Sequence, residues 1–489
     1  MLATLVSAAV TVAQIIILLV ALFVIPGGRR PQTAMAWVVL LALVPFVGIA
    51  IFVIFGRASV GRKRTEEQAR VNEAIVSTRL RDDAGDEAAI TSLPGDVQGF
   101  ARLNTQLAGL PMTFDNRLEL FPDYLESIAA MTREVAAARR YVHVEFYITA
   151  WDEVTAPFYE ELVRATERGV TVRLLFDHLG SYGIPVYKEL VRRLSATRIQ
   201  WARMLPLRPL HGEFRRPDLR NHRKIVVVDG RVAFTGSQNL IEPHYDKPGN
   251  QRKDRAWVEL VGRVEGPAVR ELNVVFATDW LGETGENLGE LVAELPPPAA
   301  PAAAAAQVGM QVIPSGPGFT TENNLRLFNS MLYSARSKLS ITSPYFVPDD
   351  SLLYAVTTAA ERGVDVELFV GATADQFMVS HAQRSYYEAL LKAGVTIWLY
   401  PEPFVLHSKH LSVDGRVAML GSSNMDMRSF ALNYEVVVMF TGEEALRQLG
   451  AVEDRYRALS TRLTIDVWRQ RPRTSIWMDN LMRLTATLQ

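Results

Sequence analysis

The 489-residue chain contains no cysteine, which excludes disulfide bridges, thiol nucleophiles and cysteine-zinc sites together. Its formal net charge is only −1, whereas nucleic-acid-binding proteins usually carry a basic excess. The His-Glu-x-x-His pattern of metalloproteases and the Gly-x4-Gly-Lys-Ser/Thr loop of nucleotide hydrolases are also absent. The chemistry of this chain must therefore be sought in other side chains.

Charged side chains are scarce in residues 1–56, where Arg29 and Arg30 alone separate two long apolar runs. The runs cover about 4–24 and 33–55, and as helices each is long enough to cross a hydrocarbon core. A cleaved signal peptide is disfavoured, because no basic segment precedes the first run and a second run follows at once. We therefore predict an N-terminal two-helix transmembrane hairpin.

Basic residues gather just after the second apolar run, at Arg57, Arg62, Lys63 and Arg64, and none precedes the first run. By the positive-inside rule, this asymmetry predicts a multi-pass protein of the cell membrane whose catalytic domains are cytoplasmic. The polar stretch that follows predicts a juxtamembrane basic segment and tether over residues 57–99, with a helix at its start.

One motif occurs twice in the remainder of the chain. It reads His-x-Lys-x4-Asp-Gly-Arg-Val-Ala, and a Gly-Ser-x-Asn segment follows at the same offset in both copies. Its polar members are His222, Lys224, Asp229, Ser237 and Asn239 in the first copy and His407, Lys409, Asp414, Ser422 and Asn424 in the second. A single His-x-Lys is most often part of an ordinary strand, but two copies in register indicate a duplicated functional site.

The geometry of a strand brings the polar members of each motif together. Residues two apart point to the same face, so the histidine and the lysine lie side by side. The apolar run after them and the Asp-Gly turn signal predict a hairpin. A lysine charge with serine and asparagine donors suits a phosphate. Two such half-sites can surround one phosphorus atom, where one histidine attacks, the other protonates the leaving alkoxide, and no metal is needed.

The sequence around the motifs is also duplicated and predicts an α/β fold. Helix, strand, helix and strand are expected at 124–135, 141–148, 155–168 and 170–177, and again at 322–336, 339–346, 351–362 and 364–371. The tetrapeptide Glu-Arg-Gly-Val occurs in both sets. A Pro/Ala-rich linker at 295–307 predicts a first catalytic half at 100–294 and a second at 308–489.

Each histidine also needs a partner for its second ring nitrogen, a role that a carboxylate usually fills. We predict Asp254 and Glu435, because each follows a motif asparagine and precedes an apolar run; a salt bridge at the core edge is the alternative for both. Asp229 and Asp414 are counted with the catalytic set as members of the motif. Each nevertheless precedes a glycine, where the natural role of an aspartate is to cap the hairpin turn.

Two further features lie outside the motifs. An apolar stripe at helical spacing ends the chain and predicts an amphipathic helix packed on the domain, with membrane-surface contact as the alternative. The stripe consists of Trp477, Leu481, Leu484 and Leu488. A basic loop ahead of the first motif either binds anionic head groups or is simply solvated. It carries Arg208, His211, Arg215, Arg216 and Arg220.

The duplicated motif resembles that of the phospholipase D superfamily, and nearly the whole chain resembles the bacterial cardiolipin synthases within it. The resembling stretches include 33–37, 55–57, 116–123, 145–147, 264–267, 279–280, 344–349 and 428–430. The chain departs from the family at Ser237, where a second glycine is usual, and in the Gln238 to Glu242 segment that follows.

The resemblance implies two phospholipase D-like α/β sandwich domains with a shared central cleft. It implies phosphatidyl transfer between two phosphatidylglycerols, giving cardiolipin and glycerol through a covalent phosphatidyl-histidine. His222 would attack and His407 would act as acid and base, although the two could exchange roles. The motif lysines would hold the charge on the phosphoryl oxygens, with the substrate-binding serines and asparagines at 237, 239, 422 and 424. The implied partners are phosphatidylglycerol, other anionic phospholipids and the inner membrane, with no metal, cofactor or nucleic acid.

Several alternatives stay open at this point. Water as the second acceptor would give a membrane-bound phospholipase D that releases phosphatidic acid. A nuclease of the superfamily is disfavoured by the paired membrane runs, and an inactive scaffold by two intact motifs. Phosphatidylethanolamine is possible as a co-substrate, and the oligomeric state, including a homodimer, is undetermined. Because one imidazole must be neutral and the other protonated, we expect a bell-shaped dependence of activity on pH.

Overall fold

The computed structural model describes residues 2–27, 31–56, 84–208, 216–293, 308–319 and 322–485. The chain forms two compact units, Met1–Ser59 and Val60–Gln489. Several predicted features lie outside the described residues: the basic positions 29, 30, 57 and 62–64, the helix expected early in the 57–99 segment, loop positions 211 and 215, the whole linker at 295–307, and Leu488.

The first unit contains α1 (Leu2–Val24), α2 (Pro31–Leu43) and α3 (Pro45–Phe55). The prediction of one continuous helix over 33–55 is wrong, because Pro45 has no N–H to donate and its ring clashes with the preceding turn. Within the described ranges, no helix combines the length and the hydropathy needed to cross a membrane. The predicted two-span hairpin is therefore not confirmed.

The second unit is built on one mixed sheet whose described part has sixteen strands. The first half contributes β1 (Thr113–Phe121), β2 (Tyr141–Phe146), β3 (Thr171–Asp177), β4 (Gln200–Met204), β5 (Arg220–Asn221), β6 (Ile225–Val228), β7 (Val232–Gly236) and β9 (Val261–Glu265), of which β5 pairs with a strand of the second half. The second half contributes β10 (Val308–Ser315), β11 (Lys338–Thr342), β13 (Asp365–Gly371), β14 (Thr396–Tyr400), β16 (His410–Val413), β17 (Val417–Gly421), β19 (Asn433–Phe440) and β20 (Thr461–Leu463).

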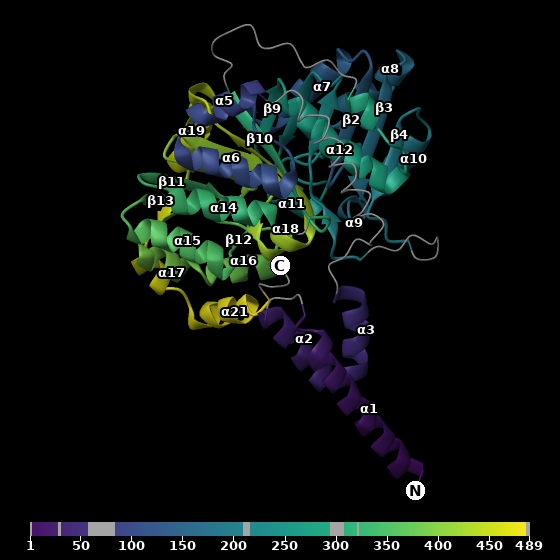
Figure 1. Ribbon diagram of the computed structural model, residues 1–489, viewed down its shortest axis with the longest axis vertical. Helices are drawn as coiled ribbons and strands as arrows, with labels where there is room; N and C mark the ends of the chain where they lie inside the picture. Colours follow the sequence, from purple (N-terminus) through teal and green to yellow (C-terminus); the bar gives the residue numbers. More distant parts are fainter. Residues whose placement is uncertain are drawn as a thin grey trace. The chain divides into compact units, whose positions relative to one another are not determined.

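The order of the strands repeats around the centre of the sheet. It runs β20-β14-β13-β11-β16-β17-β19-β10-β1-β9-β7-β6-β2-β3-β4, with β1 and β10 paired antiparallel in the middle. Each half has three parallel strands at its outer side and the antiparallel motif hairpin further in. The predicted duplication of α/β halves is confirmed, and the two halves share a continuous sheet (Figure 1).

Helices cover both faces of this sheet. On one face lie α12 (Ala268–Thr284) and α19 (Glu443–Leu459), whose apolar residues form one core with the central strands. On the other face, separate cores are formed in the first half by α7 (Tyr124–Ala136), α8 (Ala156–Glu167) and α10 (Tyr187–Ser195), and in the second by α14 (Asn323–Ser334), α15 (Asp350–Glu361) and α17 (Tyr387–Ala393). These helices and strands agree with the predicted helix-strand repeats.

Two helices connect distant parts of the sequence. After α5 (Ala84–Ser92), α6 (Gly95–Ala108) precedes the first half in the chain but packs into the core of the second half through Val97 and Phe100. At the other end of the chain, after α20 (Ile465–Arg469), α21 (Arg473–Arg483) packs against α16 (Phe377–Arg384). The face of α21 that packs carries Asp479, so the predicted packing of the Trp477 stripe on the domain is wrong.

Candidate functional site

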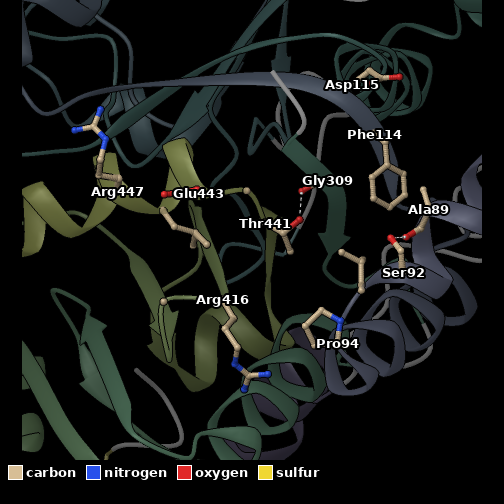
Figure 2. Close-up of a pocket in the computed structure, with 14 residues that line it drawn as sticks. Ala89, Ser92, Pro94, Phe114, Asp115, Gly309, Arg416, Thr441, Glu443 and Arg447 are labelled. Atoms are coloured by element: carbon tan, nitrogen blue, oxygen red, sulfur yellow. Dashed lines mark hydrogen bonds between the residues drawn. The ribbon is translucent and has the colours of Figure 1, made fainter. Parts of the chain in front are cut away.

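Two cavities of the second unit differ in their chemistry. The larger, about 970 Å³, lies beside α5 and the start of α19, and its lining contains no histidine or lysine (Figure 2). The arginine at its base, Arg416, is held in ion pairs with Asp96 and Asp414 at 2.9 and 3.0 Å. The smaller cavity, about 510 Å³, is lined by His222 and His407 together. Reactive groups therefore converge on the smaller cavity.

Each motif histidine is held in place by the opposite half of the protein. Just before His222, β5 (Arg220–Asn221) pairs parallel with β19 of the second half, and the His222 N–H donates to the Tyr434 carbonyl at 2.8 Å. Just before His407, β15 (Val405–Leu406) pairs parallel with β8 (Trp257–Val258) of the first half. The His407 N–H donates to the Val258 carbonyl, also at 2.8 Å. The two crossings place both histidines at the boundary between the halves.

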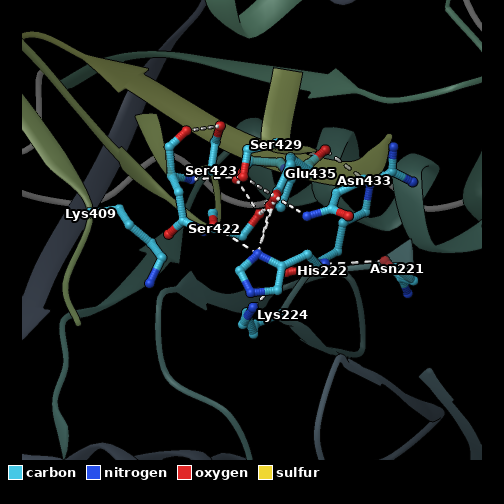
Figure 3. Close-up of polar contacts among 12 residues, drawn as sticks. Asn221, His222, Lys224, Lys409, Ser422, Ser423, Ser429, Asn433 and Glu435 are labelled. Carbon is cyan, nitrogen blue, oxygen red and sulfur yellow. Dashed lines mark hydrogen bonds and ion pairs between the residues drawn. The ribbon is translucent and has the colours of Figure 1, made fainter. Parts of the chain in front are cut away.

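The carboxylate partners are exchanged between the halves in the same way. Nδ1 of His222 lies 3.0 Å from Oε2 of Glu435, and Nδ1 of His407 lies 2.7 Å from Oε1 of Glu259. Both glutamates are buried. Figure 3 shows Glu435 above the imidazole of His222, where Ser422 and Ser429 also donate to its carboxylate. The second nitrogen of each ring, Nε2, is left for substrate.

Glu259 corrects one prediction. Asp254 is exposed, and its carboxylate lies 3.3 Å from Nε2 of His244, which is not a motif histidine. Asp254 occupies a polar turn, whereas Glu259 follows β8, and that strand brings it to His407. A signal was present in the sequence: Glu259 begins Glu-Leu-Val and Glu435 begins Glu-Val-Val, two acids that directly precede apolar strands.

The protonation of the pairs favours neutral imidazole beside ionised carboxylate. Burial lowers the pKa of His222 to about 4, although the Glu435 charge acts in the opposite direction. Burial also lowers the pKa of His407, with Glu259 opposing. Burial alone would raise the pKa of Glu435, but the adjacent His222 and Lys224 outweigh it and lower that pKa. A neutral imidazole that donates Nδ1–H to a carboxylate presents the Nε2 lone pair of a nucleophile.

The motif lysines lie beside the histidines, as predicted, although residues 222–224 and 407–409 connect two strands and do not belong to one. Nζ of Lys224 donates to the His222 carbonyl at 2.6 Å, and Nζ of Lys409 lies 3.1 Å from Nδ1 of His407. Burial lowers the pKa of Lys224 to about 7 and that of Lys409 to about 8. Two partly desolvated ammonium groups at one site are held together most easily by a bound anion.

The asparagine and the serine of each Gly-Ser-x-Asn segment lie in different surroundings. Asn239 and Asn424 line the cavity, and Oδ1 of Asn424 is buried without a partner in the described residues. The serines point elsewhere: Ser422 donates to Glu435, and Ser237 accepts the Leu260 N–H at 3.0 Å. Neither serine lines the cavity, and both belong to the layer that holds the glutamates, so their predicted contact with substrate stays a prediction.

The motif aspartates are structural. The Asp229 carboxylate accepts the backbone N–H groups of residues 139–141 at 2.8 to 2.9 Å, and Asp414 accepts those of 336–338 at 2.8 to 3.0 Å. Both have a positive φ, 55° and 52°, in the hairpin turn. Neither lines the cavity of the histidines. Their place in the catalytic set is corrected, and the turn-capping role is the one observed.

The cavity also contains two tyrosines that the sequence did not single out as site residues, together with Arg220. Tyr147 stands edge-on to His222 with ring centroids 4.9 Å apart, and Tyr345 stands edge-on to His407 at 6.3 Å. The hydroxyl of Tyr345 donates to Asp375 at 2.7 Å. Arg220, from the predicted basic loop, lines the cavity and pairs with buried Asp177 at 3.0 Å. The tyrosines share a position in the two halves, but no duplicated motif marks them.

A buried ion pair lies beneath the first histidine. The Arg223 guanidinium contacts the Asp279 carboxylate, and Nε of Arg223 donates to the Glu435 carbonyl at 3.0 Å. Both side chains are almost completely buried. The pair therefore connects α12 to the residue that holds His222. In the described part of the chain, no group of three or more acidic, histidine or cysteine side chains is arranged to hold a metal ion.

Comparison with known proteins agrees with this geometry. A family profile described as cardiolipin synthase, PLD-like domain matches residues 131–280 and 328–455, and one described as phospholipase D-nuclease N-terminal matches 13–57. The chain is 34% identical over 450 residues to cardiolipin synthase A of Proteus mirabilis (strain HI4320), covering 91% of this chain and 90% of that protein. It is also 34% identical over 461 residues, with the same coverage, to cardiolipin synthase A of Yersinia pseudotuberculosis serotype O:3 (strain YPIII).

Among solved structures, the chain is similar to phosphatidylserine synthase of Haemophilus influenzae Rd KW20. The TM-score is 0.60 at 14% identity, covering 79% of this chain and 99% of that one. At this identity the likeness concerns the fold alone, and it extends across both halves.

Proposed function

The chain belongs to the cardiolipin synthase family of phospholipase D-like phosphatidyltransferases, and on that premise we propose that it joins two phosphatidylglycerols into cardiolipin with release of glycerol. One observation carries the proposal: His222 and His407 line one cavity, and each is oriented by a buried glutamate from the opposite half. This arrangement serves a displacement at one phosphorus atom with acid-base help from the far side.

In the first step, Nε2 of His222 attacks the phosphorus of the donor phosphatidylglycerol. The bond from phosphorus to the glycerol oxygen breaks, and His407 gives its proton to that oxygen. Glu435 accepts Nδ1–H of His222 and stabilises the positive charge that the ring acquires on phosphorylation. The negative phosphodiester favours the protonated form of His407 on binding, which offsets the desolvation of the ring.

In the second step, a hydroxyl of the acceptor phosphatidylglycerol gives its proton to the now neutral His407. Its oxygen attacks phosphorus, and the phosphorus–nitrogen bond to His222 breaks. In both steps Lys224, Lys409 and the two motif asparagines stabilise the charge that develops on the phosphoryl oxygens. Buried ammonium groups serve this task well, because a site with little water does not screen them.

We place the enzyme at a membrane through its first unit, with two membrane-crossing segments at 4–24 and 33–55 and cytoplasmic halves at 100–294 and 308–489. The apolar runs of the sequence support this placement. So do the large apolar side chains that the unit exposes, among them Phe23 at 85% and Val53 at 76%. Exposed apolar surface of this extent is typical of contact with lipid.

The test is lipid analysis by mass spectrometry after incubation of the purified full chain with phosphatidylglycerol vesicles. The proposal expects cardiolipin and free glycerol in equal amounts, both lost in His222→Ala and in His407→Ala. Asp365→Asn, an exposed carboxylate at the start of β13, is a matched control that should retain full activity. Phosphatidic acid as the sole product would replace the transferase with a hydrolase, and unchanged lipid would overturn the choice of substrate.

A further inference from the structure

Helix α21 presents an apolar stripe to solvent. Trp477, Leu481 and Leu484 follow one another at helical spacing, and they are 68%, 53% and 78% exposed. Side chains of this size are normally buried, and a row of three on one face marks a contact surface rather than chance exposure.

The opposite face of the helix holds it to the domain. The buried carboxylate of Asp479 lies 2.7 Å from Nδ1 of His381 on α16, and α21 runs beside α16 (Figure 1). Arg471 and Arg384 add longer contacts to the same carboxylate, at 3.6 and 3.9 Å. The helix is thus anchored through these polar contacts and through Met482, which packs against the core of the second half, whereas its apolar stripe contributes nothing to that core.

Basic side chains lie beside the stripe. Arg469, Arg473 and Arg483 are all exposed, and the exposed acid within residues 465–485 is Asp466. Of the acids that neighbouring helices bring near these arginines, Glu388 is paired with Lys392 and Asp350 begins α15. An apolar face flanked by arginines is the pattern of helices that lie in the interface of an anionic bilayer. Two copies of the chain that met through this face would bring like charges together, which disfavours a second copy as the occupant.

The helix that α21 packs against leads directly to the reaction cavity. Met378 of α16 lines the cavity together with His407, and its neighbour Phe377 is 62% exposed. We propose that α21 and the start of α16 form a membrane-docking surface that rests on an anionic bilayer and holds the cavity mouth at the level of the lipid head groups. This inference rests on the proposed function, since it assumes that the substrates are lipids within that bilayer.

The absence of cysteine allows a direct test in the full chain. An environment-sensitive fluorophore is attached at Leu481→Cys, and the labelled protein is reconstituted into phosphatidylglycerol vesicles. We expect a blue-shifted emission that lipid-borne quenchers reduce. The same label at Glu361→Cys, exposed at the end of α15, should show the emission of a fluorophore in water. An aqueous spectrum at position 481 in a preparation that makes cardiolipin would overturn the proposal, as would a shift in lipid-free buffer that grows with protein concentration.

A second experiment separates docking from folding and from catalysis. The triple variant Trp477→Ser, Leu481→Ser, Leu484→Ser should lose about tenfold or more in activity on vesicles, because three apolar side chains no longer enter the bilayer. Its activity on phosphatidylglycerol dispersed in detergent should stay within about twofold of the wild type. Equal activity of variant and wild type on vesicles would overturn the docking surface. Failure of the proposed function looks different, because the wild type itself would then make no cardiolipin.

Discussion

The surroundings of His222 and of His407 are alike in chemistry and unlike in support. Each histidine has a lysine two residues on, a buried glutamate from the opposite half and a tyrosine at its edge. Beneath His222, however, lie the buried pairs Arg223–Asp279 and Arg220–Asp177. Beneath His407 the corresponding positions are Ser408, Leu406 and Val405, and the support is apolar.

In the mechanism proposed above, this difference suits the two halves to different tasks within one duplicated plan. A nucleophile must present its lone pair from one fixed direction, and charged pairs with directional hydrogen bonds fix a backbone more strictly than apolar packing does. On the other side, Asp375 lies at Tyr345 and opposes the loss of the proton from His407. The first half-site is thus suited to attack and the second to proton transfer.

Removal of either imidazole should have the largest effect. His222→Ala and His407→Ala should each lower kcat by about 10³-fold or more, because nucleophile and proton donor act as a unit. Steady-state formation of cardiolipin measures the loss, and circular dichroism checks the fold. A variant that kept a tenth of the activity would remove that histidine from the mechanism.

The next largest effect should be on stability, where variants of the charged support beneath His222 and of the support beneath His407 should differ. Arg223→Ala leaves Asp279 buried without its partner and should lower the free energy of unfolding by about 3–5 kcal/mol. Ser408→Ala, at the equivalent position, should cost only about 1 kcal/mol, because it removes a neutral hydroxyl and leaves no buried charge without its partner. Denaturant unfolding of the two variants decides the matter, and equal losses would contradict the asymmetry.

We expect Glu259 and Glu435, each of which orients the histidine of the opposite half, to contribute about equally to kcat. Glu259→Gln and Glu435→Gln keep the size of the side chain but lose the charge that orients and stabilises the imidazole, and each should lower kcat by about 10²-fold. Asp254→Asn is the matched control and should stay within about twofold of the wild type. If Asp254→Asn were the damaging change, the pairing of His407 with Glu259 would be wrong.

The dependence of kcat/KM on pH should be bell-shaped. Below a pH near the lowered pKa of His222, about 4, the nucleophile is protonated and activity falls. Toward higher pH activity falls again, because His407, whose pKa burial lowers from its ordinary value, loses its proton first, and Lys224, with a pKa of about 7, loses its proton next. Asp375→Asn removes a negative charge that raises the pKa of His407 and of Lys409, so the alkaline limb should move to lower pH. An alkaline limb that stayed at the same pH or moved to higher pH would contradict this role of Asp375.

The sequence predicted the repeated features of the molecule and failed where residues far apart in the chain meet. The duplicated motif and the βαβ spacing predicted the fold of each half, and the His-x-Lys spacing predicted Lys224 beside His222, although residues 222–224 connect two strands and do not form one. Glu259 was missed because its partner lies 148 positions away, across a strand pairing that local patterns do not reveal. Proximity to the motif favoured Asp254 instead, a residue of a solvated turn.

Residues inside the motif were also given roles that the fold assigns differently. Ser422 has the chemistry of a phosphate donor, but the strand pairing of β17 with β19 turns it toward Glu435. Asp414 has the chemistry of a catalytic acid, but its turn lies at the far end of the hairpin and binds backbone N–H groups. Composition and spacing identify which groups are present, whereas packing decides which of them face the cavity.

The most direct test of the account is the covalent intermediate itself. The full chain is mixed with short-chain phosphatidylglycerol, quenched in alkali within one turnover, digested and analysed by mass spectrometry, with His222→Ala as the control. We predict a phosphatidyl adduct on the peptide that contains His222 and none in the control. An adduct on His407 would reverse the roles of the two half-sites, and cardiolipin formation with no adduct on either histidine would contradict the mechanism.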